Sequence, residues 1–261
     1  MKEIRMFEAF AGYGSQLLAM RRLEKEFPNQ IKVIPVGISE IEPAAIKAYQ
    51  ALHGGVPNYG NICTIDWAQV PDFDLFTYSF PCTDISAAGM QQGFSKDSGT
   101  RSSLLWECER AVAIKRPKYL LMENVKALVQ SKFIKGFHEW LRLLESYGYY
   151  NFSKVLNSKD FGVAQNRERI FVISILATPD NPNPRFHFPQ PFPLVKRLKD
   201  YLEPHVDEKF YLSDKMLEYF QRVDNDDSHG HDFTPKDGDD TAFTIRTAPG
   251  TRVDDNYLFD E

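Results

Sequence analysis

The side chains with the clearest chemical potential are a thiol, a carboxylate and two guanidinium groups, each next to an apolar run. Cys82 follows Pro81 in Ser-Phe-Pro-Cys, Glu123 begins Glu-Asn-Val, and Arg167 and Arg169 lie in Gln-Asn-Arg-Glu-Arg. A cysteine at an accessible strand end is a candidate nucleophile. An apolar setting favours the neutral form of a carboxyl group, and forked cations bind carbonyl oxygens, carboxylates or phosphates.

These groups suit conjugate addition to an electron-poor ring. The thiolate of Cys82 would add to the ring, the acid Glu123 would protonate a ring nitrogen, and an arginine would hold the ring oxygen. The ring is then a pyrimidine, activated to accept an alkyl group from an adenosine-based carrier. Simpler interpretations exist: Cys82 as a buried structural thiol, Asn124 as a helix cap, and the arginines as a solvated charge run.

The segment Phe10-Ala-Gly-Tyr-Gly-Ser15 is a glycine turn after an apolar strand. Gly12 and Gly14 allow the backbone to turn sharply and to approach a ligand. Glu40 ends the next apolar run, where a carboxylate accepts hydrogen bonds from ribose hydroxyls. No third glycine completes a dinucleotide fingerprint, so the pattern favours an adenosine ligand without a pyrophosphate, although two glycines also make an ordinary tight turn.

The hydrophobic periodicity predicts strands alternating with helices. This alternation is typical of a parallel, doubly wound α/β sheet covered on both faces, with ligands at the carboxyl ends of the strands. The predicted strands are 4–10, 34–38, 74–78, 119–122, 149–156 and 170–176. The predicted helices are 16–27, 43–52, 101–115 and 126–146.

Six prolines between residues 179 and 193 predict a domain boundary, because regular structure does not continue through that density. We therefore expect a cofactor-binding and catalytic domain at 1–178, a proline-rich linker at 179–193 and a small region at 194–261. In this last region, 198–202 and 213–220 resemble short helices and 242–247 a strand. The acidic stretch 224–240 predicts a solvated loop or disorder.

The spacing of the cysteines argues against a metal site and a disulfide framework, and the distribution of charge limits which part of the chain could face phosphates. Residues 1–200 have 25 Lys and Arg against 20 Asp and Glu, whereas residues 201–261 have 6 against 16. Only the first part could therefore face phosphates. Cys63, Cys82 and Cys108 form no metal-binding spacing and no disulfide framework, and we expect Cys63 and Cys108 to be buried. Without a membrane-length apolar run or a secretory leader, the sequence predicts a cytoplasmic protein with no metal and no membrane partner.

In this order, these segments resemble the motifs of the DNA cytosine-5 methyltransferases over about residues 4–176. Phe10–Ser15 resembles the first motif, which binds S-adenosylmethionine, and Ser39-Glu40 and Gly60-Asn61-Ile62 resemble the second and third. The Pro-Cys, Glu-Asn-Val and Gln-x-Arg-x-Arg motifs have their counterparts at Cys82, Glu123 and Arg169. The resemblance implies a Rossmann-like S-adenosylmethionine-dependent methyltransferase sheet with a partial second recognition region.

The resemblance also assigns roles. Cys82 would attack C6 of a flipped cytosine in double-stranded DNA, Glu123 would engage N3 and the amino group, and Arg167 and Arg169 would hold the ring oxygen side. Residues that would line the cofactor pocket are Phe10, Ala11, Gly12, Tyr13, Gly14, Ser15, Glu40, Ile41, Asn61, Ile62 and Pro81. Residues that would contact DNA are Ser86, Gln91 and Arg101.

The sequence departs from the family pattern in three places. Asn61 stands where Asp is usual, Thr83 follows the cysteine where Gln is usual, and neither the late Gly-Asn-Ser-Val segment nor the preceding Arg-containing motif is found. The first hypothesis is the amino-terminal catalytic portion of a methyltransferase, truncated or split, of the kind found in restriction-modification systems. A second polypeptide would then supply the late motifs. The alternatives are a binding module that does not turn over alone and an RNA cytosine methyltransferase of the same fold.

Overall fold

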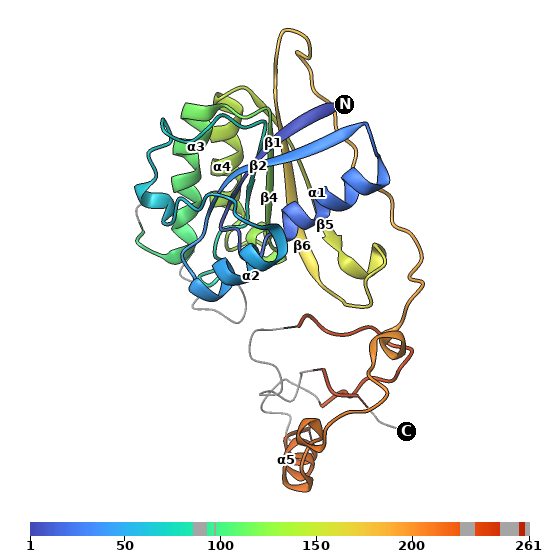
Figure 1. Ribbon diagram of the computed structural model, residues 1–261. Coiled ribbons are helices and arrows are strands. Elements are labelled where there is room, and N and C mark those ends of the chain that lie inside the picture. Colours follow the sequence, from blue (N-terminus) through green and yellow to red (C-terminus); the bar gives the residue numbers. More distant parts are fainter. Residues whose placement is uncertain (86–92, 97, 225–232, 246–255, 259–261) are drawn as a thin grey trace. The chain divides into compact units, whose positions relative to one another are not determined.

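The computed structural model describes the chain except residues 86–92, 97, 225–232, 246–255 and 259–261 (Figure 1). The described residues form two compact units. The first comprises residues 1–155 and 169–188, and the second comprises 156–168 and 189–261. The predicted linker, 179–193, spans the division after residue 188, and the segment 156–168 belongs to the second unit.

The centre of the first unit is a six-stranded sheet with the order β2-β1-β3-β4-β6-β5. Pairing is parallel between β1 and β2, β1 and β3, and β3 and β4, whereas β4 and β6 are antiparallel. The prediction of a wholly parallel sheet is therefore wrong at β6. The strands are β1 (Lys2–Ala9), β2 (Ile31–Ser39), β3 (Leu75–Tyr78), β4 (Tyr119–Val125), β5 (Tyr149–Asn157) and β6 (Glu168–Leu176).

Helices pack on both faces of this sheet, which explains its apolar strands. Neighbouring residues of β1 point to opposite faces. Phe7 belongs to a core cluster with Val112 and Trp140, whereas Met6 packs in another with Leu17 and Tyr49. The helices of the first cluster are α3 (Glu107–Lys115) and α4 (Ile134–Ser146), and those of the second are α1 (Ser15–Glu26) and α2 (Pro43–His53). The predicted doubly wound α/β class is confirmed (Figure 1).

Two predicted helices are shorter than the sequence indicated. Residues 101–106 form the 3₁₀ helix η2 (Arg101–Trp106) before α3, and a 3₁₀ turn, η3 (Lys126–Val129), precedes α4. Strand β4 extends through Val125, so Asn124 lies within a strand and caps no helix. Its side chain donates to the carbonyl of Phe80 (3.0 Å) and accepts from the backbone N–H of Val125 (2.8 Å). Sequence periodicity missed this strand extension because Glu and Asn are poor strand formers.

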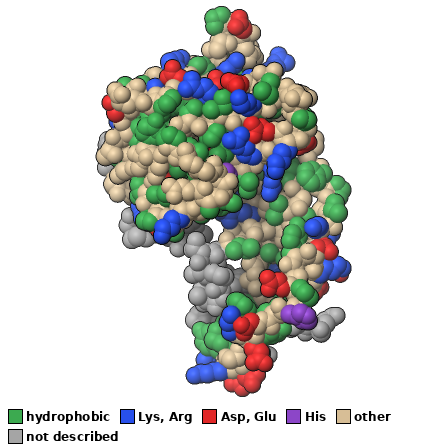
Figure 2. All heavy atoms as spheres, viewed as in Figure 1, with side chains coloured by type: hydrophobic (Ala, Val, Ile, Leu, Met, Phe, Trp, Pro, Cys, Tyr) green, Lys and Arg blue, Asp and Glu red, His purple; other side chains and the backbone are tan. Residues whose placement is uncertain are grey.

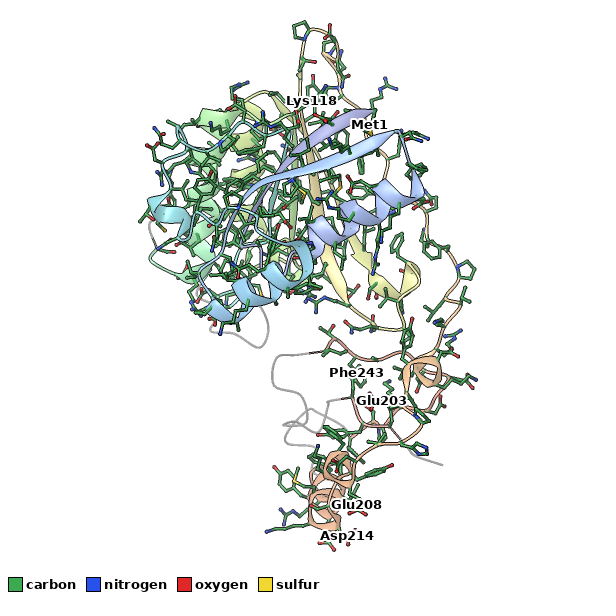
Figure 3. All side chains as sticks on the ribbon, viewed as in Figure 1. Met1, Lys118, Glu203, Glu208, Asp214 and Phe243 are labelled. Atoms are coloured by element: carbon green, nitrogen blue, oxygen red, sulfur yellow. The ribbon has the colours of Figure 1, made fainter. Side chains whose placement is uncertain are left out.

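The second unit consists mainly of irregular chain. Its elements include η4 (Ser158–Asp160), η5 (Leu198–Tyr201), η6 (Glu208–Phe210) and α5 (Asp214–Asp224). The helix predicted at 198–202 is therefore a 3₁₀ turn, and the helix predicted at 213–220 is confirmed as α5. In place of the expected strand at 242–247, Ala242 forms one isolated bridge with Gln165, and residues 246 and 247 lie outside the described part. Figure 3 labels Glu203, Glu208, Asp214 and Phe243 of this unit.

Candidate active site

The candidate site lies at one edge of the sheet. Because β1, β2, β3 and β4 run in parallel, the segments that follow them begin at the same edge. These segments carry the glycine turn after β1, Glu40 after β2, the Pro81-Cys82 step after β3, and Glu123 near the end of β4. β6 runs in the opposite direction, so its first residues, Arg169 among them, begin at this same edge.

The turn after β1 requires glycine at one of its two glycine positions for steric reasons. Gly14 has φ of 80°, and a Cβ there would lie 2.6 Å from the Tyr49 ring and 2.5 Å from the His53 ring. Gly12 also has a positive φ, 56°, but a Cβ there would meet no atom within 4 Å. Phe10 has φ of 56°, which is uncommon for a bulky residue and strains the backbone. The space that a side chain at Gly12 would occupy is therefore open, because no atom lies within 4 Å of the added Cβ.

Glu40 holds the glycine turn against the end of β2. Its Oε2 accepts a hydrogen bond from the backbone N–H of Gly12 (2.8 Å). Its Oε1 accepts from the N–H groups of Ile41 and Glu42, both at 2.8 Å. A carboxylate has about four acceptor positions, so these bonds leave room for a hydroxyl group. The structure thus reveals a loop-organising role that the strand-end pattern did not predict.

Asn58 is a contributor that the sequence analysis missed. Its side-chain oxygen accepts from the N–H of Glu40 (3.1 Å) and of Gly60 (3.0 Å), and its amide donates to the carbonyl of Glu40 (2.9 Å). Asn58 therefore fixes the main chain that carries Glu40. The only local signal was an Asn two residues before a glycine, a common feature of turns.

The remaining predicted cofactor residues differ widely in exposure. Ile41 and Tyr13 are 65% and 53% exposed, and Ser15 is also exposed, whereas Ala11 and Ile62 are buried in the core clusters. The carbonyl of Tyr13 lies 3.0 Å from Nε2 of His53. Asn61 is exposed, and its side-chain oxygen accepts from the N–H of Cys63 (3.0 Å), leaving that oxygen a second lone pair.

Cys82 is partly exposed and begins a turn four residues after the end of β3. The residue before it, Pro81, is half-buried, and the residue after it, Thr83, is exposed. Within the same segment, the Cys82 carbonyl accepts from the N–H of Ile85 (3.0 Å). The amide of Asn124 bonds the carbonyl of Phe80, so the chain that leads to the thiol is tied to β4 one residue beyond Glu123.

Glu123 and Arg169 form an ion pair at the sheet edge. The distance from Glu123 Oε1 to Arg169 Nε is 3.2 Å, and the two side chains are 24% and 17% exposed. In the antiparallel ladder Glu123 pairs with Phe171, so Arg169, two residues earlier on β6, lies diagonally across the same face. Carboxylate and guanidinium thus lie together, although 46 residues separate them in sequence.

Other predicted residues are not joined to this pair by any described contact. Arg167 belongs to the second unit, where its N–H donates to Asn157 Oδ1 (3.1 Å) and its carbonyl accepts from Ser158 (3.1 Å). Arg101 is exposed at the start of η2. Ser86 and Gln91 lie outside the described residues.

The other two cysteines differ from each other. Cys108 is fully buried in α3, as predicted, and burial raises the pKa of its thiol well above the usual range. The expected burial of Cys63 is wrong, because it is exposed in the turn η1 (Ile62–Thr64). Partial desolvation, aided by Glu107, raises the pKa of its thiol. Neither environment promotes a thiolate, which leaves Cys82 as the candidate nucleophile.

The described part of the chain has neither a metal-binding cluster nor a membrane-spanning helix. Among these residues, no three His, Cys, Asp or Glu side chains gather in a way that would hold a metal ion. No helix in the same ranges has the length and apolar character needed to cross a bilayer.

A family model decides the relationship: that for C-5 cytosine-specific DNA methylase matches residues 4–248. The chain belongs to this family. Members take their methyl group from S-adenosylmethionine, so the predicted family, enzyme class and methyl donor are confirmed. The open space beside the backbone of Gly12 and the remaining acceptor position of the Glu40 carboxylate fit this donor.

Relatives and solved structures support the assignment. The chain is 43% identical over 267 residues to "Type II methyltransferase M2.ScrFI" of Lactococcus lactis subsp. cremoris, covering 82% of this chain and 71% of the relative. It is 37% identical to "Type II methyltransferase M.NlaX" of Neisseria lactamica, covering 84% and 66%. The chain thus spans about two thirds of the length of these relatives. It also resembles the Dnmt2 structure from S. pombe with a TM-score of 0.65 at 22% identity, covering 91% of this chain and 68% of that one, which shows the fold.

Proposed function

We propose that this chain methylates C5 of cytosine in double-stranded DNA through a covalent bond between Cys82 and C6. The supporting observation is the Glu123–Arg169 ion pair at the sheet edge where the Cys82 segment begins. The side-chain amide of Asn124, near the end of β4, donates to the carbonyl of Phe80 beyond β3 and so ties these two strand ends together. Family membership supports the reaction class, and the Glu123–Arg169 ion pair supports the choice of these residues.

The proposed sequence of events begins with the thiolate of Cys82 adding to C6 of the extruded cytosine. Glu123 holds or delivers the proton at N3 and accepts from the exocyclic amino group, so negative charge does not accumulate on the ring. Arg169 orients Glu123 and binds the ring oxygen. For Arg167, the same role rests on the motif resemblance alone. When bound, S-adenosylmethionine supplies the methyl group to C5. Loss of the C5 proton to a base then restores the ring double bond, and the Cys82 sulfur departs as a thiolate.

The cofactor would lie on the glycine turn. Gly12 leaves its side of the turn open, and Glu40 retains an acceptor position for a ribose hydroxyl. Phe10, Ile41, Asn61 and Ile62 would border the adenine, and Ala11, Tyr13, Gly14, Ser15 and Pro81 would complete the pocket. Ser86, Gln91 and Arg101 would contact DNA. The cytoplasmic location stays a prediction.

An oligonucleotide duplex that carries 5-fluorocytosine tests the proposal. Fluorine at C5 cannot leave as a cation, so the adduct between enzyme and DNA persists after methyl transfer. We expect a stable complex that peptide mapping assigns to Cys82, formed by the wild type and absent in Cys82→Ala. A matched Cys63→Ala variant should form the complex at the wild-type rate. Attachment at Cys63 or Cys108, or an adduct that survives Cys82→Ala, would refute the mechanism.

A second candidate is a chain that binds cofactor and DNA but turns over only with another polypeptide. Exposed apolar side chains in the second unit favour it, including Val195 (88%), Phe210 (72%) and Tyr201 (56%). Equilibrium binding of labelled cofactor and DNA without methyl transfer would favour this candidate. Methyl transfer by the chain alone would eliminate it, and transfer to a matched RNA duplex but not to DNA would favour an RNA substrate.

A further inference from the structure

Two polar side chains are buried beside the Cys82 segment, where the proposed chemistry gives them no role. Asp84 is 5% exposed and Ser102 is fully buried. They come from different segments, the turn after β3 and the 3₁₀ helix η2. Buried polar groups of this kind are retained only where hydrogen bonds compensate for lost hydration.

Ser102 binds the main chain on both sides of Cys82. Its Oγ donates to the carbonyl of Pro81 (2.7 Å) and accepts from the N–H of Asp84 (3.2 Å). One hydroxyl has one donor and two acceptor positions, so both bonds form together. Its own N–H donates to Oδ2 of Asp84 (3.0 Å), which makes the contact reciprocal.

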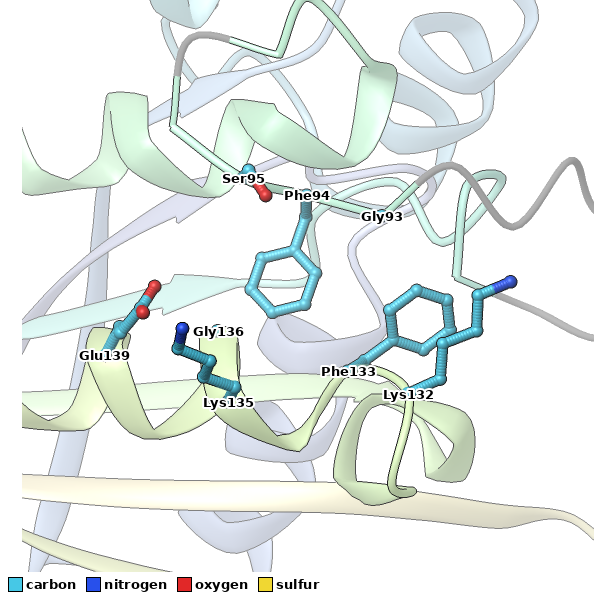
Figure 4. A pocket seen from close by; sticks show the side chains of 8 residues that line it. All are labelled: Gly93, Phe94, Ser95, Lys132, Phe133, Lys135, Gly136 and Glu139. Atoms are coloured by element: carbon cyan, nitrogen blue, oxygen red, sulfur yellow. The ribbon is translucent and has the colours of Figure 1, made fainter.

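The bonds of Ser102 to Pro81 and Asp84 form a clamp on the Cys82 segment. A second set of contacts holds the chain beyond this clamp. The carbonyl of Asp84 accepts from the N–H of Gly93 (2.9 Å), and Nε1 of Trp106 donates to the carbonyl of Phe94 (2.7 Å). The Phe94 ring points toward α4 at Gly136, where an added Cβ would lie 2.9 Å from the ring (Figure 4). Asp84 and Ser102 are therefore built into a packed region.

From this geometry we propose that Ser102 and Asp84 are positioning residues for Cys82. The inference rests on the proposed function, because it assigns them the task of holding the main chain that carries the nucleophile. No described hydrogen bond joins either side chain to the Cys82 thiol, so their role is to hold the main chain. Attack on a ring carbon depends steeply on alignment, and a displacement of about 1 Å can reduce a rate about 100-fold.

The adjacent serine provides a matched control. Ser103 belongs to the same turn, and its Oγ donates to the carbonyl of Thr100 (2.6 Å). It has no described bond to residues 81–84. Ser102→Ala and Ser103→Ala therefore each remove one buried or partly buried hydroxyl from η2, but only Ser102→Ala releases the segment around Cys82.

The first measurement is the rate of adduct formation on the 5-fluorocytosine duplex at saturating cofactor. We expect Ser102→Ala to lower this rate about 10- to 100-fold. Ser103→Ala should change it less than about twofold, and the KM for S-adenosylmethionine should stay within about twofold in both variants. Equal rates in the two variants, with the wild type forming the adduct, would overturn the positioning role and leave the proposed function intact.

Asp84 offers an independent pair of variants. Asp84→Asn keeps an acceptor oxygen for the Ser102 N–H, whereas Asp84→Ala removes it. We expect Asp84→Asn to retain at least about a third of the wild-type rate and Asp84→Ala to lose about tenfold or more. If Ser102→Ala fails to fold, this pair decides the question, and equal rates in Asp84→Asn and Asp84→Ala would contradict the inference.

Hydrogen exchange provides a readout that does not depend on activity. The N–H of Asp84 donates to Ser102 Oγ, so Ser102→Ala should accelerate its exchange at least about tenfold while Ser103→Ala leaves it unchanged. Unchanged exchange in Ser102→Ala would show that the clamp does not hold this segment. A wild type that exchanges slowly but forms no adduct would refute the proposed function, and with it the role assigned to the clamp.

Discussion

The two compact units differ in how they bury their apolar side chains. In the first unit, Trp140, Tyr78 and Phe76 are completely buried and lie in ring contact with one another or with neighbours. In the second unit, Phe220 is buried in a small aromatic cluster with Phe233 and Tyr257, whereas Phe210 and Val195 are 72% and 88% exposed. Figure 2 shows hydrophobic side chains interspersed with acidic and basic ones on the visible surface. The packed core of the first unit holds the edge of the sheet in place. The Glu123–Arg169 pair, the glycine turn and the Cys82 segment all belong to this unit.

The largest expected effect tests this difference in burial. Trp140→Ala would remove a fully buried ring and its bond from Nε1 to the Tyr78 hydroxyl (3.1 Å), lowering the free energy of unfolding by about 3–5 kcal/mol. Phe210→Ala should change it by less than about 0.5 kcal/mol, since that ring is mostly exposed. Urea unfolding followed by circular dichroism measures both. Comparable losses would show that the exposed ring of Phe210 stabilises the fold as much as the buried ring of Trp140, against the difference in burial.

The next effect tests whether the first unit carries the chemistry. Glu123→Gln preserves the shape of the side chain but removes its charge and its proton-transfer capacity, so we expect methyl transfer to slow about 100-fold or more. Single-turnover transfer from labelled cofactor measures the rate. Glu145→Gln, an exposed change in α4, should leave it unaltered. Near-normal rates in Glu123→Gln would remove this residue from the mechanism.

A smaller effect is expected at the glycine turn. Gly14→Ala would place a methyl group 2.5 Å from the His53 ring in a backbone with φ of 80°, and should lower the free energy of unfolding by about 1–3 kcal/mol. It should also weaken binding of S-adenosylmethionine, measured by isothermal titration calorimetry. Gly55→Ala is the control, because a Cβ there meets no atom within 4 Å. Equal behaviour of the two variants would mean that the turn tolerates a side chain.

A pH dependence of stability is also expected inside the first unit. Burial raises the pKa of Glu8 to about 7, partly offset by hydrogen bonds from Tyr49 and the Leu17 N–H. The folded chain therefore binds this proton more tightly than the unfolded chain, whose pKa is near 4.5. The stabilisation is complete below pH 4.5 and is lost as pH rises to about 7, with a slope of at most about 1.4 kcal/mol per pH unit.

Glu8→Gln tests this linkage, because glutamine imitates the protonated acid and does not titrate. Unfolding measured from pH 5 to 8 should show a smaller decline with rising pH in Glu8→Gln than in the wild type. Parallel curves would indicate that Glu8 is already ionised in the folded protein at pH 5, against the effect expected from its burial.

Much of the first unit could be predicted because its signals are local. Pro43 at the first position of α2, the alternation within β1 and the glycine turn after it depend on residues a few positions apart. The exposure of Cys63, and the 3₁₀ helices η2 and η3 that replace the first turns of two predicted helices, could not be predicted from such local signals. They depend on which turn each backbone adopts when neighbouring segments compete for its hydrogen bonds.

The sequence by itself determined the family, the doubly wound class and the residue types available for chemistry, because motif spacing and hydrophobic period are properties of the chain alone. Tertiary structure decided which of those residues meet. The reversal of β6 brings Arg169 beside Glu123, and the bonds of Ser102 hold the main chain on both sides of Cys82. Strand direction and register between distant segments are set by the packing of the whole sheet, which no local pattern encodes.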